Sequence, residues 1–312
     1  MAFYLEELTV RLATGIGLFP QDDRRQLADF LIAAQQPDGG FAGREGGSDL
    51  YYTSFALRGL AILGELHGDL AADCAGYLQQ QLQGEVANVD FFSLLYAAAL
   101  LESASGINIY EGADPAWPDR VAGQLELLRR DDGGYAKAAE GMASSTYHSF
   151  LVLLCQQLVG RPASEPERLV EFLLSQQAEE GGFHEIRASK RAGTNPTAAA
   201  IAALQILDAL DEETGQRTAH FLAQMQTDEG GMRANTRIPI ADLLSTFTGL
   251  LTLGDLGALE MIDDAAALRY ARSLQQPSGG FFGAAWDEQA DVEYTFYGIG
   301  ACALLTVAQH DQ

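Results

Sequence analysis

Two helical patterns of apolar and polar residues alternate along the chain. In the first pattern, segment 22–36 places Leu27 and Leu31 on one stripe and charged residues on the opposite side. In the second pattern, segments such as 49–66 and 198–207 are apolar nearly all round. A helix with one apolar stripe covers a core, whereas a helix that is apolar on every side is buried on every side. The alternation therefore predicts amphipathic outer helices and apolar inner helices.

Glycine pairs separate the two patterns and repeat with a nearly fixed period. They lie at 39–40, 133–134, 181–182, 230–231 and 279–280, with spacings of 94, 48, 49 and 49 residues. The first spacing covers two periods, because a copy near residue 87 has lost its glycines and keeps the glutamines before them. Glycine just past a helix adopts the left-handed conformation that satisfies the last carbonyl groups. Six units follow, with inner helices that begin near Asp49, Asp90, Ser144, Thr194, Ile240 and Asp291.

These repeats predict an all-α fold, an (α/α)6 barrel or toroid of six helical hairpins with inner and outer helix rings. It forms a single domain over residues 1–312, with an N-terminal helix in 1–20 and six repeats of about 48 residues from 21 to 312. An open solenoid of helix pairs is the alternative, but it leaves polar faces on both sets of helices. The apolar inner segments favour the closed toroid.

The repeated text resembles the repeat of the prenyltransferase β-subunit and squalene cyclase (terpenoid cyclase) superfamily. The clearest copies are Gln36-Pro-Asp-Gly-Gly-Phe41, Gln177-Ala-Glu-Glu-Gly-Gly-Phe183, Gln226-Thr-Asp-Glu-Gly-Gly-Met232 and Gln276-Pro-Ser-Gly-Gly-Phe281. The resemblance implies a central funnel in which aromatic residues at the N-terminal ends of the inner helices hold an isoprenoid chain. Rings at these positions either bind such a chain or fill the core; they are Tyr51, Tyr52, Phe91, Phe92, Tyr147, Phe247, Tyr294 and Tyr297.

The zinc site of protein prenyltransferases is only partly matched. The family holds zinc through an Asp, a Cys two residues later and a His of the last repeat, and these positions read Asp242, Leu244 and Tyr294. Because leucine is no ligand and tyrosine a poor one, zinc is disfavoured. Asp291 and Glu293 would join Asp242 in an oxygen-rich site that suits magnesium, or all three carboxylates cap inner helices.

The acid of class II terpene cyclases has no direct counterpart. The family supplies it from an Asp-x-Asp-Asp run, which this sequence lacks. A lone inner-helix aspartate, such as Asp49, Asp90 or Asp291, would have to act instead. His148 also lies near the start of an inner helix, where it is either a proton carrier or a hydrogen-bonded packing residue.

Charge adds a further candidate site. The chain has 43 acidic and 19 basic residues and a net charge of -24, which disfavours nucleic acid and anionic lipid surfaces. Five basic residues nevertheless gather in two loops, and guanidinium groups bind phosphate oxygens well; they are Arg187, Lys190, Arg191, Arg233 and Arg237. The resemblance implies diphosphate binding in this region, although the residues do not coincide with those of the family. The alternative is solvated loops paired with neighbouring acids.

Three isolated cysteines, Cys74, Cys155 and Cys302, suggest a reducing compartment, and we expect a cytoplasmic protein. No signal peptide and no transmembrane segment is predicted. The resemblance implies a helical-repeat α subunit as partner, with a homo-oligomer as the alternative.

The sequence thus predicts a prenyltransferase-like toroid that binds a polyprenyl diphosphate, and leaves turnover open. The alternatives are a terpene cyclase-like enzyme and a non-catalytic toroid that binds an isoprenoid or a protein. An unrelated sugar-processing α/α barrel is disfavoured by the repeated glutamine-glycine-aromatic text.

Overall fold

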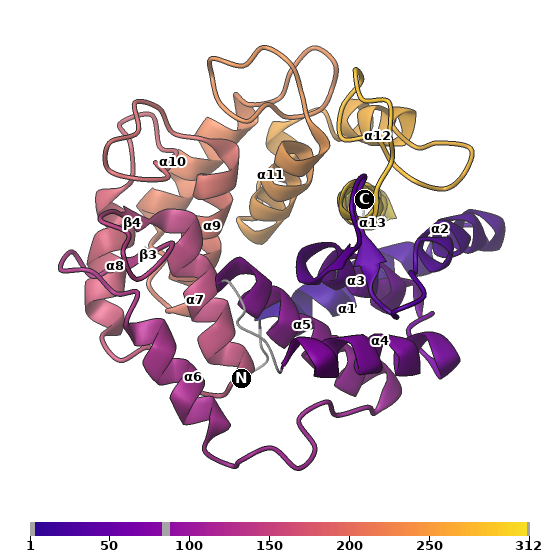
Figure 1. The fold of residues 1–312 in the computed structure, drawn as a ribbon. Helices are drawn as coiled ribbons and strands as arrows, with labels where there is room; N and C mark the ends of the chain where they lie inside the picture. Colours follow the sequence, from indigo (N-terminus) through magenta and orange to yellow (C-terminus); the bar gives the residue numbers. More distant parts are fainter. Residues whose placement is uncertain (1–3, 83–87, 311–312) are drawn as a thin grey trace. The chain divides into compact units, whose positions relative to one another are not determined.

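The computed structural model describes residues 4–82 and 88–310. In these ranges the chain is mostly helical, and its strands are two short hairpins (Figure 1). Contacts between residues divide it into two compact units. Unit 1 comprises residues 1–114 and 271–312, and unit 2 comprises residues 115–270. Each unit is built from the helix pairs that the repeats predict.

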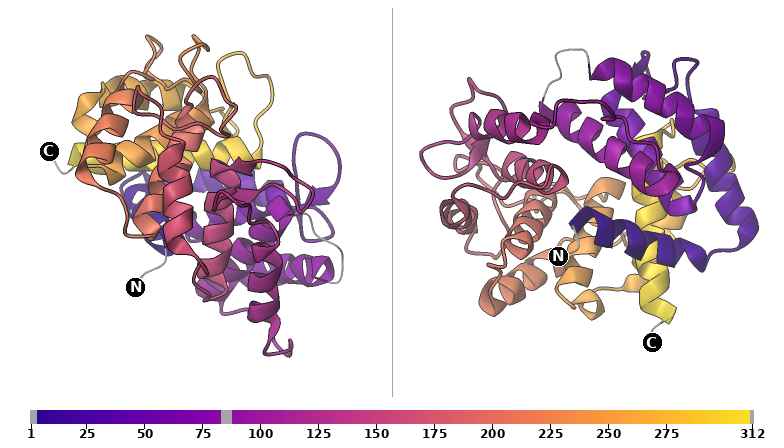
Figure 2. Two further views of the ribbon diagram at one scale, coloured as in Figure 1. Left: turned by 90° about the vertical axis from the view of Figure 1, so that its left-hand side faces the viewer. Right: turned by 90° about the horizontal axis from the view of Figure 1, so that it is seen from below.

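Unit 1 has three inner helices: α3 (Leu50–Leu63), α5 (Asn88–Ser105) and α13 (Val292–His310). Helix α3 packs between α5 and α13. The outer helices α2 (Gln21–Ala33) and α4 (Gly68–Gln81) pack on α3 and α5, respectively. The first helix, α1 (Tyr4–Gly17), lies across α13 and α3 (Figure 2). Strands β1 (Phe41–Ala42) and β2 (Ser48–Asp49) pair antiparallel, with Phe41 opposite Asp49.

Unit 2 repeats this arrangement with three inner helices, α7 (Thr146–Leu158), α9 (Thr194–Ile206) and α11 (Leu243–Asp255), which pack in that order. Its outer helices are α6 (Trp117–Glu126), α8 (Pro166–Ser175) and α10 (Glu212–Ala223). The 3₁₀ helix η1 (Leu259–Met261) follows α11, and α12 (Asp264–Ser273) crosses the boundary between the units. Strands β3 (Tyr135–Ala136) and β4 (Ser144–Ser145) form the second hairpin.

The inner helices begin close to the predicted positions. Helix α11 was expected near Ile240 but begins at Leu243, because Asp242 caps it and accepts a hydrogen bond from the Ser245 N–H at 2.7 Å. The glycine-free copy predicted near residue 87 lies outside the described residues. The contacts divide the chain into two compact units, and the single domain over residues 1–312 stays a prediction.

The glycine pairs hold neighbouring repeats together. The first glycine of every described pair has φ between +88° and +98°. A Cβ on it would overlap a backbone carbonyl of the next outer helix, as Gly133 would with Arg168 and Gly181 with Arg217. The second glycine lies against an aromatic ring of that helix, as Gly182 does against Phe221. Only glycine therefore permits this approach.

The residue after each glycine pair joins the turn to its own inner helix. Phe41, Tyr135, Phe183, Met232 and Phe281 are almost fully buried. Each backbone N–H donates to a Thr or Ser hydroxyl on the inner helix, at 2.8–3.1 Å; the acceptors are Thr53, Ser149, Thr197, Thr246 and Thr295. This bond explains why the inner helices carry a hydroxyl 12 to 14 residues after the motif.

Within unit 1, the last repeat returns to the first. Gly279 lies against the Gln26 carbonyl of α2, and the Gln26 side chain donates to the Pro277 carbonyl. Helix α13 also packs on α3 and α1. An open solenoid keeps its first and last repeats apart. The observed contacts are those of a toroid, as predicted.

Candidate functional site

Aromatic rings of unit 1 form a connected cluster on its inner helices. Phe55 lies at its centre, with ring centroids 4.9 Å from Tyr51, 5.2 Å from Tyr297 and 5.6 Å from Phe296. Most of these pairs are edge-to-face, the geometry that aromatic quadrupoles favour. Phe92 and Tyr96 of α5 form a second ring pair, with centroids 5.8 Å apart. We call both groups of rings, on α3, α5 and α13, the aromatic face; its members are Tyr51, Tyr52, Phe55, Phe92, Tyr96, Tyr294, Phe296 and Tyr297.

The structure thus brings together five predicted residues, Tyr51, Tyr52, Phe92, Tyr294 and Tyr297. Phe55, Phe296 and Tyr297 are buried, whereas Tyr51, Tyr52 and Tyr294 are half-buried. The buried rings support the half-exposed ones, which leave apolar surface open to contact. Phe55, Tyr96 and Phe296 were not singled out from the sequence, although Phe55 and Phe296 lie within a few residues of predicted rings.

A guanidinium group lies among these rings. Arg58 of α3 is half-buried, and its guanidinium carbon lies 4.3 Å from the centroid of Phe55 and 4.7 Å from that of Tyr96. Sequence reasoning missed Arg58. Its signal was a single charge in an otherwise apolar helix, four residues after Ser54.

The acids at the edge of the aromatic face already have partners. Asp49 and Asp291 cap α3 and α13 by accepting from the N–H groups of Tyr52 and Tyr294, each at 2.8 Å. Arg44 donates from Nε to Asp291 at 2.7 Å. Its other nitrogens bind the Asp287 carboxylate at 2.5 and 2.7 Å. The predicted acids Asp49 and Asp291 therefore serve as helix caps in this structure.

Glu293 lies differently. Its carboxylate accepts a hydrogen bond from Tyr51 Oη at 2.7 Å and is half-buried. Burial raises the pKa of Glu293, the bond from Tyr51 opposes this, and the Asp291 carboxylate raises it further. Burial likewise raises the pKa of Asp49. Burial therefore favours the protonated form of Glu293 and of Asp49 alike.

In unit 2, predicted residues surround the start of α7. Ser145 caps this helix, and its hydroxyl lies 2.9 Å from His148 Nδ1 and donates to Glu185. Burial lowers the pKa of His148, with Lys137 adding to the effect, and burial raises the pKa of Glu185. The Tyr147 ring is exposed by 39% and meets His148 edge-to-face at 5.6 Å. His148 is therefore hydrogen-bonded through Nδ1, its lowered pKa favours the neutral form, and its role as a proton carrier or a packing residue stays a prediction.

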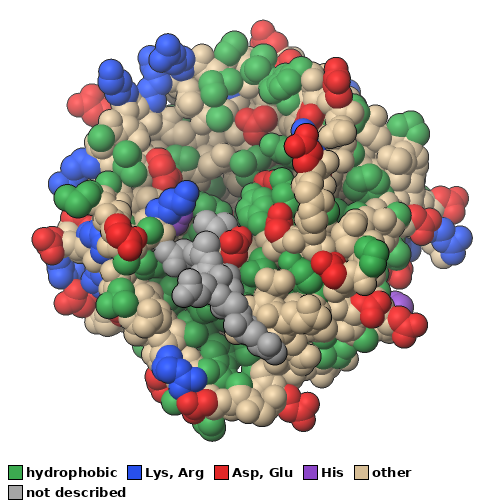
Figure 3. All heavy atoms as spheres, viewed as in Figure 1, with side chains coloured by type: hydrophobic (Ala, Val, Ile, Leu, Met, Phe, Trp, Pro, Cys, Tyr) green, Lys and Arg blue, Asp and Glu red, His purple; other side chains and the backbone are tan. Residues whose placement is uncertain are grey.

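The two basic loops of unit 2 lie side by side. Thr194 binds the carbonyls of Arg233 and Ala234, and Arg191 donates to the Thr236 hydroxyl at 3.1 Å. Arg187, Lys190, Arg191 and Arg237 are exposed. Arg233 is half-buried and donates to the Gln224 carbonyl at 3.0 Å. Four cations are thus free to meet solvent on a surface where acidic side chains are otherwise widespread (Figure 3).

The predicted Asp242 and Phe247 lie at the start of α11. Asp242 accepts from both the N–H and the hydroxyl of Ser245, at 2.7 and 2.8 Å, and burial raises its pKa. Phe247 is buried. Within residues 4–82 and 88–310, no three His, Cys, Asp or Glu side chains are grouped as metal ligands. A magnesium site of Asp242 with Asp291 and Glu293 stays a prediction.

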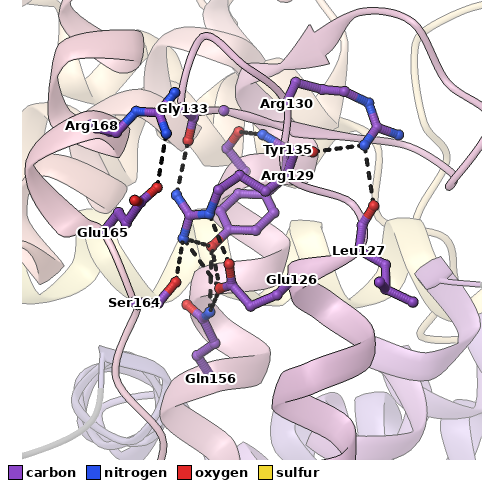
Figure 4. Close-up of polar contacts among 12 residues, drawn as sticks. Glu126, Leu127, Arg129, Arg130, Gly133, Tyr135, Gln156, Ser164, Glu165 and Arg168 are labelled. Atoms are coloured by element: carbon purple, nitrogen blue, oxygen red, sulfur yellow. Dashed lines mark hydrogen bonds and ion pairs between the residues drawn. The ribbon is translucent and has the colours of Figure 1, made fainter.

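The side chains of a partly buried polar network in unit 2 hydrogen-bond to one another (Figure 4). Glu126 accepts from Arg129 Nε at 2.7 Å, Tyr135 Oη at 2.8 Å and Gln156 Nε2 at 3.1 Å. The Arg129 guanidinium also lies 4.7 Å from the centroid of the Tyr135 ring. Because the charges of Arg129 and Glu126 cancel inside the network, we assign it to the structure of the third repeat.

These repeats define an α/α toroid whose inner helices, and the loops before them, carry the candidate residues. The family model of the prenyltransferase alpha-alpha toroid domain matches residues 13–87, 117–237 and 198–311. The chain therefore belongs to the prenyltransferase toroid family. No curated protein sequence matches it.

Solved structures agree with this fold. Protein geranylgeranyltransferase-I of Candida albicans, complexed with GGPP, is 15% identical, with 90% of each chain covered and a TM-score of 0.70. The type II terpene cyclase MstE of Scytonema is 14% identical over 97% of this chain and 99% of its own, with a TM-score of 0.64. An alpha-1,6-mannanase of Salegentibacter is 11% identical over 92% and 98%, also with a TM-score of 0.64. At such identities the likeness shows the fold alone. No described helix has the length and apolar character to cross a bilayer.

Proposed function

We propose that this protein is a prenyltransferase-like toroid that binds an isoprenoid chain on the aromatic face of unit 1. The observation that carries the proposal is the connected set of rings around Phe55, with Tyr51, Tyr52 and Tyr294 half-buried. Flat apolar rings suit a branched hydrocarbon chain and attract any cation formed on it. A transferase complexed with GGPP and a terpene cyclase with a geranylgeranyl substrate share the fold.

A diphosphate is the second ligand of the proposal. Exposed Arg187, Lys190, Arg191 and Arg237 supply positive charge within unit 2. Guanidinium groups bind phosphate oxygens through paired, charge-assisted hydrogen bonds. If the protein uses a metal ion, the proposal favours magnesium over zinc, because Leu244 and Tyr294 replace two zinc ligands of the family.

Cyclisation is the alternative, and Glu293 favours it. Burial raises its pKa, which favours the protonated form, and its contact with Tyr51 places this carboxyl group beside the aromatic face. Protonation of an alkene followed by loss of a proton elsewhere would leave an isomer of the substrate. Glu293 fits this role better than Asp49 or Asp291, which cap helices.

Native mass spectrometry with geranylgeranyl diphosphate and geranylgeraniol tests the binding proposal. Tyr297→Leu should weaken both ligands about three- to tenfold, because an aromatic contact contributes ~0.5–1.5 kcal/mol. The control is Phe172→Leu in outer helix α8, a buried ring outside the aromatic face that should leave affinity unchanged. Charge reversal at exposed Arg191 and Arg237 should weaken binding of the diphosphate only, whereas reversal at exposed Arg25 and Arg269 should leave binding of both ligands unchanged.

The same samples separate the alternatives. Isomeric products that vanish in Glu293→Gln would support cyclisation, and binding without any product would support a non-catalytic toroid. Products that need an added helical-repeat α subunit would support transfer. Absence of binding to both isoprenoids would contradict the proposal. A cytoplasmic location belongs to the proposal too, resting on three free, buried cysteines.

A further inference from the structure

Arg58 holds a positive charge in aromatic surroundings. Besides Phe55 and Tyr96, its guanidinium carbon lies 5.5 Å from the Phe92 centroid and 5.8 Å from the Phe296 centroid. The four rings come from α3, α5 and α13 of unit 1. Cation-π contact stabilises such a charge, but removal from water remains costly without an anion.

The hydrogen-bonding capacity of Arg58 is largely unused. Its only hydrogen bond to the described residues runs from Nη2 to Ser54 Oγ at 3.1 Å. The Nε atom is buried and has no acceptor there. Glu293 is close enough for Arg58 to lower its pKa, yet Glu293 accepts from Tyr51 and forms no ion pair with Arg58. Of the five N–H donors of this guanidinium, one thus has an acceptor among the described residues, and the Nε–H is buried without one.

Comparable arginines of this protein have their own carboxylates. Arg44 lies 5.4 Å from the Tyr294 centroid and pairs with Asp287 and Asp291. In unit 2, Arg129 lies over Tyr135 and pairs with Glu126 at 2.7 Å. Arg272 lies over Phe19 but is exposed, so water solvates it. Among the described arginines over rings, Arg58 is half-buried without a counter-ion.

We infer that Arg58 binds an anionic group, a carboxylate or a phosphate, at the end of the apolar ligand that occupies the aromatic face. The inference rests on the proposed function, since the rings around Arg58 belong to that face. A half-buried guanidinium forms strong, paired hydrogen bonds with such anions. The site lies in unit 1 and uses none of the five basic residues of the unit 2 loops. It selects acidic isoprenoids over neutral ones of equal chain length.

Three ligands of one chain length test the inference: geranylgeranoic acid, geranylgeranyl monophosphate and geranylgeraniol. The full-length protein should bind at least one of the two anions about tenfold or more tightly than the alcohol, because charge-assisted hydrogen bonds contribute ~1.5–3 kcal/mol. Arg58→Gln should remove this preference and leave alcohol affinity unchanged. Arg58→Lys, which keeps the charge, should retain part of it. Arg272→Gln is the control and should change nothing.

Equal affinity of wild-type protein for the acid, the monophosphate and the alcohol would overturn the inference. A uniform loss of all three in Arg58→Gln would also overturn it, since that result marks a packing role. The preferred anion tells a carboxylate ligand from a phosphate ligand. If no isoprenoid binds, the proposed function fails, and titration with benzoate decides the inference separately. Benzoate binding by the wild-type protein that is lost in Arg58→Gln would support the inference. Absence of benzoate binding would overturn it.

Discussion

The inner helices of unit 1, α3, α5 and α13, carry three aromatic residues each, whereas in unit 2 α7 carries two, α11 one and α9 none. Helix α9 is rich in alanine instead, and its Asn195 accepts from the Thr248 hydroxyl of α11 at 2.8 Å. Basic side chains show the opposite distribution, with four exposed cations in two loops of unit 2.

The scaffold contacts of the two units, by contrast, are the same. Gly279 of unit 1 and Gly230 of unit 2 both lie against a carbonyl of an outer helix. Thr53 and Thr197 both accept from the N–H of the motif phenylalanine. The repeat therefore fixes the backbone, and the remaining positions of each inner helix are free to diverge chemically. Substitutions at the scaffold contacts should lower stability alike in both units, whereas substitutions on the aromatic face concern unit 1 alone.

The largest expected effect comes from the glycine turns. Gly279→Ala and Gly230→Ala should each lower the free energy of unfolding by on the order of 3 kcal/mol, from positive φ and a backbone clash together. Gly46→Ala is the control, because Gly46 also has a positive φ, +89°, but has no neighbour near the added methyl. Gly46→Ala should lower the free energy of unfolding by only about 1 kcal/mol. Urea unfolding measures all three.

A loss for Gly279→Ala no greater than that for Gly46→Ala would contradict the docking of the last repeat on α2. A large loss for only one of Gly279→Ala and Gly230→Ala would break the equivalence of the two units.

The second effect comes from the hydroxyl acceptors. Thr53→Val and Thr197→Val should each cost about 1–2 kcal/mol, because a buried backbone N–H loses its partner. Thr306→Val is the matched control, since the Thr306 hydroxyl only donates to a carbonyl of its own helix. Amide hydrogen exchange at Phe41 and Phe183 should accelerate in the respective variant. Unchanged exchange at either amide would show that this bond does not hold the turn.

The smallest effect is a pH dependence. Burial raises the pKa of Glu293 in unit 1 and of Glu185 in unit 2 above the ordinary value of 4.5. The folded state then holds protons that the unfolded state releases, so ionisation costs stability as pH rises from 4.5 through the folded pKa. Glu293→Gln and Glu185→Gln should therefore stabilise the protein at pH 7.5 and have no such effect at pH 3.5. Urea midpoints at both pH values measure this difference. A gain in stability that is the same at both pH values would contradict the raised pKa.

Much of the fold was readable from the sequence, because glycine pairs and all-round apolar segments report backbone contacts directly. The start of α11 was placed three residues early, since Ile240 continues the apolar text up to the cap at Asp242. The site was less readable. Tyr51 and Tyr297 were predicted from their place on the inner helices, and both do contact Phe55.

Arg58 was not predicted, because its importance depends on rings from three helices and on the lack of an ion pair with any described carboxylate, neither of which a linear pattern contains. Asp49 was predicted as an acid, and Asp291 as an acid, a metal ligand or a cap; a linear pattern does not contain their contacts either. Only the hydrogen bonds from Tyr52 and Tyr294, and the partner Arg44, show what these carboxylates contact.

The contact between Gly279 and Gln26 has a consequence for synthesis on the ribosome. Unit 2 is one continuous stretch, so its contacts can all form once residue 270 has emerged. Unit 1 is split in the sequence, so α3 can pack on α13 only after α13 has been translated. Domains otherwise tend to fold from the N-terminus as they emerge. Here α3 meets α13 only after unit 2 has been synthesised, so the aromatic face that we assign to the ligand is assembled only once α13 has emerged.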